Sequence, residues 1–241
     1  MSRLLDLFDQ VYVVNLPSRA DRRKEMAAQL ERVGSSLVGR NVSLFPAIRP
    51  ESADGFPSIG ARGCFLSHLN ILRDADARGL NRILILEDDL DFAPDFLQRE
   101  GEVARLLEDA GWGLFYGGYV LIEPIGSAAS GPVHALASTQ GVRTTHFVGF
   151  QGEAIAEVIT HLEAILTRTP GDPEGGPMHV DGAYSRFRAG HPDCRTLLAT
   201  PELGDQRASR TDIHELQWYD RTPLIRNLVA ILRRGRNREA S

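Results

Sequence analysis

Four acidic side chains follow a continuous apolar run near the middle of the chain. The run covers residues 83–86, and the acids are Glu87, Asp88, Asp89 and Asp91. Like charges this close repel one another and burial adds to the cost, so the cluster needs protons, cationic side chains or a divalent cation. Carboxylate oxygens suit Mg²⁺ or Mn²⁺, and Mg²⁺ often completes its shell with substrate phosphates. The cluster therefore favours metal-assisted nucleotide chemistry.

The acidic cluster alone leaves other interpretations open. Its side chains could be solvated at a strand end or could cap the following helix. Response-regulator and phosphatase sites also place acids at strand ends, so the cluster does not identify a reaction.

Strand-like and helix-like segments alternate along the chain. Apolar or β-branched runs predict strands at residues 11–16, 42–48, 82–87, 113–116, 143–150 and 194–200. Helical patterns predict helices at 18–32, 62–77, 94–109, 152–167 and from about 181. Ser18 is the expected N-cap of the first of these helices. The alternation predicts an α/β fold with a mostly parallel sheet flanked by helices, and ligands of such sheets bind beyond the carboxyl ends of the strands.

Composition narrows the class of protein. The chain has 241 residues, 27 basic and 32 acidic side chains, and a formal net charge of −5. This mildly acidic balance argues against a nucleic-acid binder, which needs a basic face. Two cysteines, Cys64 and Cys194, are too few for a disulfide framework and predict reduced thiols in a cytoplasmic protein. The sequence contains neither an apolar run long enough to span a bilayer nor the pattern of a signal peptide.

The charge is unevenly distributed, and this suggests a boundary. Residues 1–220 are predicted to form a single domain, and residues 221–241, with six arginines and one glutamate, a basic C-terminal helix and tail. Leu224, Leu228, Ile231 and Leu232 would share one helical face. Such a segment could contact the inner face of a membrane as a peripheral element. A terminal helix docked on the domain, with a solvated tail, is the favoured alternative.

Three segments, taken in order, resemble glycosyltransferase family 25, which includes lipooligosaccharide and collagen galactosyltransferases. They are Val13-Val-Asn15-Leu-Pro-Ser-Arg19-Ala-Asp-Arg22-Arg23, then Gly63-Cys-Phe-Leu-Ser67-His68, then the strand that ends in Glu87-Asp88-Asp89. The later half resembles the family more loosely, at Thr145-His146, Val180-Asp181 and Gln206-Arg-Ala-Ser209. The resemblance extends over residues 9 to 215.

The resemblance implies a GT-A-like fold, a nucleotide-sugar donor and a divalent metal that bridges the donor's diphosphate. By the family pattern, Glu87, Asp88 and Asp89 would hold Mn²⁺ or Mg²⁺, and His214 would complete the metal shell. Asp89-Leu90-Asp91 also has a literal Asp-x-Asp spacing, so the pair that ligates stays open. Asp91 could instead cap the following turn.

Donor contacts are implied for residues on three segments. Asn15, Arg19 and Arg22 would meet phosphate or base at a strand end and helix start, or the arginines line a solvated helix face. Ser67 and His68 are about 100° apart on a helix, so they cannot form a nucleophile–base dyad. They would contact the donor, or His68 would buttress the carboxylate strand. The last group, which would contact the donor or brace the site, is Gln206, Ser209 and Asp212.

The resemblance implies transfer with inversion, which needs a base that takes the proton of the acceptor hydroxyl. Asp181 is the candidate, because it follows a flexible Pro/Gly loop at a helix start. An ordinary N-cap aspartate is the alternative, and Asp172 is the substitute base. His146 would be either an acceptor-site residue or a structural one.

The sequence thus predicts a metal-dependent glycosyltransferase that moves a hexose, such as galactose or glucose, from a nucleotide sugar. The donor would be a UDP-sugar, and the acceptor a hydroxyl on a glycan, lipooligosaccharide, other lipid-linked glycan or protein. One alternative is a metal-dependent phosphoesterase or nucleotidyltransferase, although a two-metal site needs acids from several strands. A non-catalytic binding module of the same fold is the other alternative.

Overall fold

The computed structural model describes residues 2–123 and 131–207. Its strands are β1 (Gln10–Asn15), β2 (Val42–Pro46), β3 (Arg82–Glu87), β4 (Leu90–Phe92), β5 (Leu114–Leu121), β6 (Val133–Leu136), β7 (Val142–Gln151), β8 (Thr196–Ala199) and β9 (Gly204–Gln206). Its helices are α1 (Arg3–Asp6), α2 (Ala20–Arg32), α3 (Ile59–Ala77), α4 (Phe96–Asp109), α5 (Ala154–Leu166) and α6 (Val180–Gly190).

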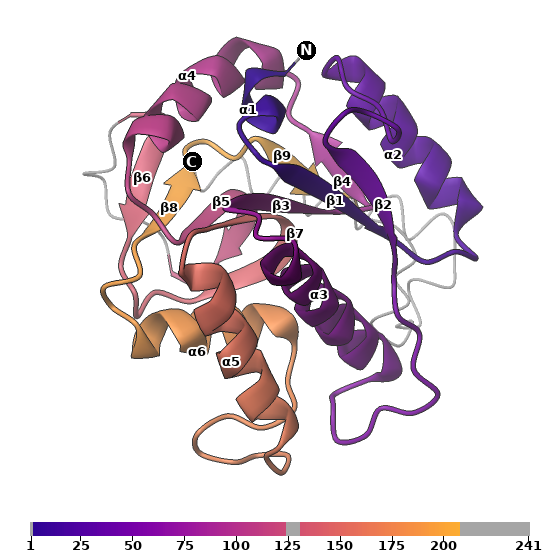
Figure 1. Cartoon of the computed structure of the whole chain (residues 1–241), viewed down its shortest axis with the longest axis vertical. Coiled ribbons are helices and arrows are strands. Elements are labelled where there is room, and N and C mark those ends of the chain that lie inside the picture. The colour runs from indigo at the N-terminus through magenta and orange to yellow at the C-terminus, as the bar shows by residue number, and fades with distance from the viewer. Residues whose placement is uncertain (1, 124–130, 208–241) are drawn as a thin grey trace.

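A seven-stranded sheet in the order β2-β1-β3-β7-β5-β8-β6 forms the centre of the fold. Strands β2, β1, β3, β5 and β8 run in one direction, and β7 and β6 run in the opposite one. Helices α1, α2 and α4 cover one face and α3, α5 and α6 the other (Figure 1). This confirms the predicted α/β class with a mostly parallel sheet flanked by helices. Strands β4 and β9 pair separately as a small antiparallel sheet.

The central position of strand β3 explains why its residues 83–86 are all apolar. Ile83 and Ile85 pack into the core beneath α3 and α5, whereas Leu84 and Leu86 pack into the core beneath α1, α2 and α4. All four side chains are fully buried. A strand covered on both faces has no solvent side, so alternation disappears. The run therefore delivers Glu87 and its neighbours to the end of a rigid central strand.

Several local predictions were wrong. Helix α2 begins at Ala20 with Arg19 as the N-cap residue, so Ser18 does not cap it. Helix α3 begins at Ile59, earlier than predicted, because the Ser58 hydroxyl accepts a hydrogen bond from the Ala61 backbone N–H. The last predicted strand is confined to β8. Strand β7 is antiparallel to both of its neighbours, β3 and β5, although helix–strand alternation favoured a parallel one.

Some of the sequence-based predictions lie outside the described residues. These are Ser209, Asp212, His214 and the whole basic segment 221–241. Within residues 2–123 and 131–207, the helices are too short or too polar to cross a bilayer.

Candidate functional site

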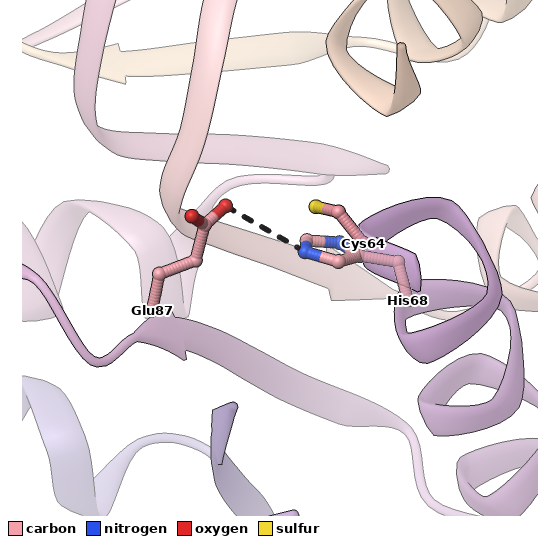
Figure 2. A group of neighbouring side chains, drawn as sticks. All are labelled: Cys64, His68 and Glu87. Carbon is pink, nitrogen blue, oxygen red and sulfur yellow. Dashed lines mark ion pairs between the residues drawn. The ribbon is translucent and has the colours of Figure 1, made fainter. Parts of the chain in front are cut away.

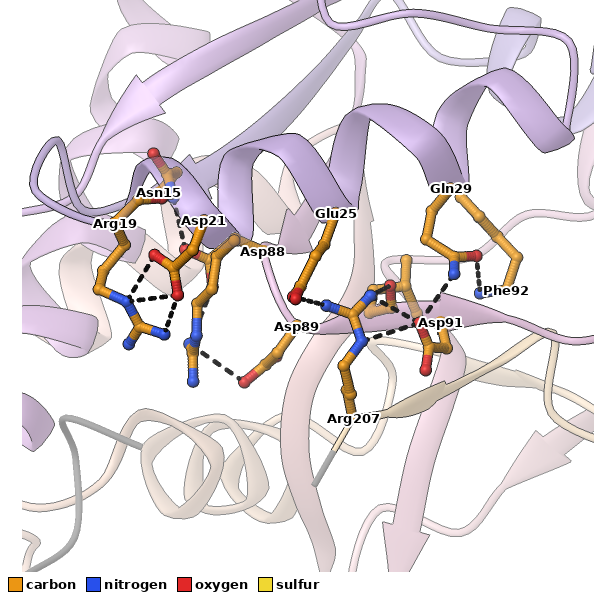
Figure 3. Close-up of polar contacts among 12 residues, drawn as sticks. Asn15, Arg19, Asp21, Glu25, Gln29, Asp88, Asp89, Asp91, Phe92 and Arg207 are labelled. Carbon is orange, nitrogen blue, oxygen red and sulfur yellow. Dashed lines mark hydrogen bonds and ion pairs between the residues drawn. The ribbon is translucent and has the colours of Figure 1, made fainter. Parts of the chain in front are cut away.

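The carboxyl ends of β1 and β3 meet at one edge of the sheet and bring two predicted residues together. The strands are parallel neighbours, with Val14 in register with Glu87. Asn15 ends β1, and its Nδ2 donates a hydrogen bond of 2.7 Å to Oδ2 of Asp88 (Figure 3). Asn15 is buried and also donates to the backbone carbonyl of Arg19. It therefore links the start of α2 to the acidic strand end.

Arg22 supplies positive charge to the same cluster. Its Nη1 lies 2.9 Å from Oδ1 of Asp88 and 3.4 Å from Oδ2 of Asp89. Burial raises the pKa of Asp88, although Asn15 and Arg22 act in the opposite direction. The structure thus relieves part of the predicted repulsion with a cationic side chain from α2.

Asp89 is only partly satisfied by these contacts. Gln206 on β9 donates weakly to its Oδ2, at 3.4 Å. The other oxygen, Oδ1, is buried and has no hydrogen-bond partner within the described parts of the chain. Burial first, and then the charge of Glu87, raise the pKa of Asp89 to about 7. A buried carboxylate oxygen without a donor is suited to a proton or a hard cation, so Asp89 fits the implied Mn²⁺ or Mg²⁺.

Glu87 points to the opposite side of the strand end from Asp88. The Thr145 hydroxyl on β7 donates to its Oε1 at 2.7 Å, and Nε2 of His68 lies 3.8 Å from the same oxygen (Figure 2). Burial alone would raise the pKa of Glu87, but His68 and Thr145 outweigh it and lower that pKa. Glu87 is therefore held as an anion facing α3.

Ser67 and His68 are both fully buried. The Ser67 hydroxyl donates to the Gly63 carbonyl at 2.7 Å and accepts from the Ile48 N–H at 2.8 Å. Nδ1 of His68 lies 3.0 Å from the Tyr184 hydroxyl. These contacts support the interpretation of His68 as a buttress of the carboxylate strand, and they give Ser67 a structural role.

A cavity of about 100 Å³ opens beside Glu87. It brings together Glu87 and Asp181, which are 94 positions apart in sequence. The other lining residues are Ala61, Cys64, Thr144, Thr145, His179, Val180 and Gln206. The N-cap alternative for Asp181 is wrong, because His179 is the N-cap of α6. Oδ2 of Asp181 instead accepts the backbone N–H of Thr144, and Oδ1 accepts that of Gly182. Asp181 is thus a fixed carboxylate on a cavity wall.

Other predicted residues lie away from this cavity. Arg19 forms an ion pair with the exposed Asp21 at 2.8 Å. Asp91 accepts hydrogen bonds from Gln29 and Arg207 and forms, with them, a separate group further along α2 (Figure 3). It does not cap the next helix, whose N-cap residue is Asp95.

His146 and Asp172 also have structural partners. His146 is buried between the Thr144 hydroxyl and the Gly204 carbonyl, and burial lowers its pKa, which supports the structural alternative. Asp172 accepts a hydrogen bond from Glu174 N–H within its own loop and does not line the cavity.

Sequence reasoning missed Cys64, which it described as a reduced thiol. Its side chain lines the cavity beside Glu87. Burial raises the pKa of the Cys64 thiol well above its ordinary value, and the charges of Glu87, Asp181 and Asp89 raise it further. A signal was present, because Cys64 and His68 are four positions apart and so share one face of a helix.

Comparisons with known proteins give sequence relatives and no match to a protein-family model. The chain is 33% identical over 138 residues to human "Inactive glycosyltransferase 25 family member 3", covering 48% of this chain and 23% of the relative. It is 33% identical over 133 residues to a "Glycosyltransferase 25 family member" of Aedes aegypti, covering 45% and 21%. It is 30% identical over 118 residues to mouse "Procollagen galactosyltransferase 2", covering 42% and 18%. The match thus spans less than a quarter of these relatives' length.

A solved structure of a glycosyltransferase involved in glycosylation of the major capsid of PBCV-1 has 13% sequence identity to the chain and a TM-score of 0.36. The alignment covers 80% of this chain and 93% of that one. A TM-score this low does not establish a shared fold, so the fold is described by the strand order of the chain's own sheet. The sequence relatives confirm the resemblance to glycosyltransferase family 25, and several of them carry the word inactive in their names.

Proposed function

We propose that this chain, a sequence relative of glycosyltransferase family 25, is a metal-dependent glycosyltransferase that transfers a hexose from a nucleotide sugar to a hydroxyl acceptor with inversion. The observation that carries the proposal is the cavity shared by Glu87 and Asp181, next to an acidic strand end. Two carboxylates in one cavity, one of them fixed by two backbone N–H groups, suit proton transfer from a hydroxyl group.

Asp181 is the proposed base. The N–H groups of Thr144 and Gly182 each donate to one of its oxygens, at 3.0 and 2.7 Å. These bonds hold the carboxylate in one orientation. The acceptor hydroxyl would donate its proton to Asp181 as its oxygen attacks the sugar, and the nucleoside diphosphate would leave with the bonding electrons.

Asp89 is the proposed ligand of Mn²⁺ or Mg²⁺, with His214 as the additional ligand and Asp88 held in place by Asn15 and Arg22. Glu87 instead faces Thr145 and His68. When bound, such an ion offsets the negative charge that develops on a leaving diphosphate. The unshared Oδ1 of Asp89 supports this assignment.

The donor would lie along the strand ends rather than inside the cavity. A cavity of about 100 Å³ is smaller than pockets that enclose whole ligands, which are roughly 300–1,000 Å³. It therefore suits only the reacting hydroxyl and the sugar carbon. The rest of the donor, for which we propose a UDP-galactose or UDP-glucose, would extend past Gln206 toward Asn15, Arg19 and Arg22. Ser209, outside the described residues, stays a proposed donor contact. The acceptor would be a glycan, a lipid-linked glycan such as lipooligosaccharide, or a protein hydroxyl.

One assay panel tests the proposal. Purified protein is incubated with several nucleotide sugars, with Mn²⁺, Mg²⁺ or EDTA, and the melting temperature and the released nucleotide are measured. Stabilisation by a nucleotide sugar only with metal, and release of nucleoside diphosphate, support the proposal. Release of monophosphate or pyrophosphate instead indicates a phosphoesterase or nucleotidyltransferase. No response to any nucleotide sugar overturns it.

A non-catalytic binding module is the second candidate, because several sequence relatives are named inactive. Metal-dependent stabilisation by a nucleotide sugar without release of nucleotide, in the presence of varied saccharide acceptors, favours this candidate. The matched variants Asp181→Asn and Asp172→Asn distinguish the two, because only a transferase loses turnover with the first and keeps it with the second.

A membrane-linked acceptor is a separate part of the proposal. The six arginines after residue 220 would attract anionic lipid. The full chain and a chain ending at residue 220 are compared in pelleting with phosphatidylglycerol vesicles and with neutral ones. Equal pelleting of both chains would remove the argument for a lipid-linked acceptor.

A further inference from the structure

Three side chains of different chemistry converge beneath the cavity. Cys64 and His68 lie one turn apart on α3, and Glu87 ends β3 (Figure 2). A ligand atom of each, the thiol sulfur, an imidazole nitrogen and a carboxylate oxygen, lies within 4.8 Å of the others. From this arrangement we infer that Cys64, His68 and Glu87 form a binding site for a transition-metal ion, with Zn²⁺ the best-suited ion.

The imidazole of His68 is the strongest indication. The side chain is fully buried, and its Nε2 has no hydrogen-bond partner in residues 2–123 and 131–207. The nearest carboxylate oxygen, Oε1 of Glu87, is 3.8 Å away, which is beyond hydrogen-bond distance. A buried polar nitrogen without a partner is costly. A metal ion between His68, Glu87 and Cys64 would satisfy this nitrogen.

The surrounding contacts orient both ligands toward a common point. Nδ1 of His68 lies 3.0 Å from the Tyr184 hydroxyl, so the tautomer that donates to Tyr184 leaves a lone pair on Nε2. The Thr145 hydroxyl donates to Oε1 of Glu87. Ligating histidines and carboxylates commonly carry such outer hydrogen bonds, which fix the ligand's orientation.

The ligand set selects a different ion from the neighbouring carboxylates. A thiolate and an imidazole favour Zn²⁺ and other borderline transition metals, whereas Mg²⁺ prefers oxygen ligands alone. Three protein ligands also leave a fourth position on zinc. Because Cys64 and Glu87 both line the cavity, that position would open toward Asp181. The site would thus hold zinc with an exchangeable ligand.

Cobalt provides a test that needs no nucleotide and no turnover. Bound metal is first removed from the whole chain with a chelator, and the chelator is then removed. The protein is titrated with Co²⁺, and its absorption spectrum is recorded at each step. We expect a thiolate-to-cobalt charge-transfer band in the near ultraviolet and visible bands of a four-coordinate ion. Zn²⁺ should abolish both at one equivalent per chain. Absence of the charge-transfer band overturns the inference and would indicate a buried hydrogen-bonded network only.

Cysteine variants identify the ligand. Cys64→Ser should remove the charge-transfer band and weaken Zn²⁺ binding by about tenfold or more. Cys194→Ser is the matched control, because Cys194 is the second free cysteine and lies outside the cluster; it should change neither. A band that survives in Cys64→Ser and disappears in Cys194→Ser contradicts the assignment. Melting temperatures measured with EDTA show that both variants are folded.

Glu87→Gln adds a check on the third ligand and should weaken Zn²⁺ binding while keeping the charge-transfer band. Unchanged Zn²⁺ affinity in this variant removes Glu87 from the site and overturns the three-ligand proposal. The outcome is separable from the proposed function. Nucleotide release with Mn²⁺ but no cobalt spectrum rejects the zinc site alone, and the reverse result rejects the transferase alone.

Discussion

Asp181 and Thr144 are joined by a hydrogen bond of 3.0 Å, which the backbone N–H of Thr144 donates to Oδ2 of the aspartate. Thr144 has a φ of +68°, in the left-handed region, which a β-branched residue rarely adopts. The bond ties the first turn of α6 to strand β7. Strained backbone of this kind persists only when its surroundings hold it in place, and it is concentrated at functional sites.

Replacing the proposed base should separate chemistry from binding. In Asp181→Asn the amide oxygen can still accept the Thr144 N–H, so the fold and donor binding should be kept. Turnover should fall by about 10²–10⁴-fold, the usual contribution of a general base. Nucleotide release and the melting temperature are measured in parallel. The control is Asp172→Asn, which should keep wild-type turnover; equal loss in both variants, or in neither, contradicts the assignment.

The strain at Thr144 predicts that a glycine variant is more stable than an alanine variant at this position, the reverse of the usual order in a strand. A left-handed conformation costs an L-residue about 1–2 kcal/mol, and glycine avoids this cost. Thr144→Gly should therefore be more stable than Thr144→Ala by about 1 kcal/mol in urea unfolding. Arg143, an exposed neighbour on the same strand, is the control, and there Ala should be more stable than Gly by about 0.5–1 kcal/mol. The same order of stability at both positions would show that Thr144 is unstrained.

Local sequence patterns predicted the positions of the strands and helices better than the direction in which each strand runs in the sheet. The apolar run at residues 83–86 reads correctly as a strand buried on both faces, because burial leaves its signature in each residue. The reversal of β7 leaves no such signature, since alternation of side chains is the same in either direction. Strands β4 and β9 are three residues each, and their pairing depends on contacts between residues more than 100 positions apart.

The candidate site was also only partly predictable from sequence, because its pairings depend on how distant segments pack. The Asp88 and Asp89 cluster was identified because consecutive acids after a strand are unusual. Their partner Arg22, however, was predicted to contact phosphate or base of the donor, or to line a solvated helix face. The pairing depends on how α2 crosses the ends of β1 and β3, and sequence spacing does not encode that crossing. Cys64 was predicted to be a reduced thiol rather than a site residue for a related reason, since a thiol on an apolar helix face gives no sign that a carboxylate faces it.

Removal of the Arg22 guanidinium should destabilise the protein strongly. Arg22 is buried, and Asp88 and Asp89 both lie within 3.4 Å of its Nη1. Breaking a buried pair by removing one partner costs about 3–5 kcal/mol, because it leaves an uncompensated buried charge. Arg22→Gln should show a loss in this range in urea unfolding at pH 7. A second substitution, Asp88→Asn, should recover part of it.

Arg19→Gln is the matched control for Arg22. Its ion pair with Asp21 is exposed, and such pairs contribute little to stability. Similar losses in Arg22→Gln and Arg19→Gln would mean that the acidic cluster does not depend on Arg22. Mn²⁺ should also stabilise Arg22→Gln more than wild type, because the cation then replaces the lost charge.

The raised pKa of Asp89 predicts a specific pH dependence of stability. Its pKa is about 7 in the folded protein and 3.8 for an ordinary aspartate. The folded state thus holds the proton more tightly than the unfolded state. Its stabilising effect is complete below about pH 4 and is lost as the pH rises through 7. The free energy of unfolding of wild type should fall between pH 4 and pH 8 relative to that of Asp89→Asn.

Urea unfolding at unit pH steps measures this difference, and only the change with pH counts, because Asp89→Asn also alters the contact with Arg22. Asp95→Asn is a control of opposite sign. The hydrogen bond from Arg99 lowers the pKa of Asp95, so the ionised carboxylate stabilises the wild type, and this stabilisation is lost as the pH falls below 4. Asp95→Asn should lack this contribution at every pH. Parallel curves for wild type and Asp89→Asn from pH 4 to pH 8 would show that Asp89 titrates normally. In that case its buried oxygen would have a hydrogen-bond donor or a cation that stabilises the ionised form.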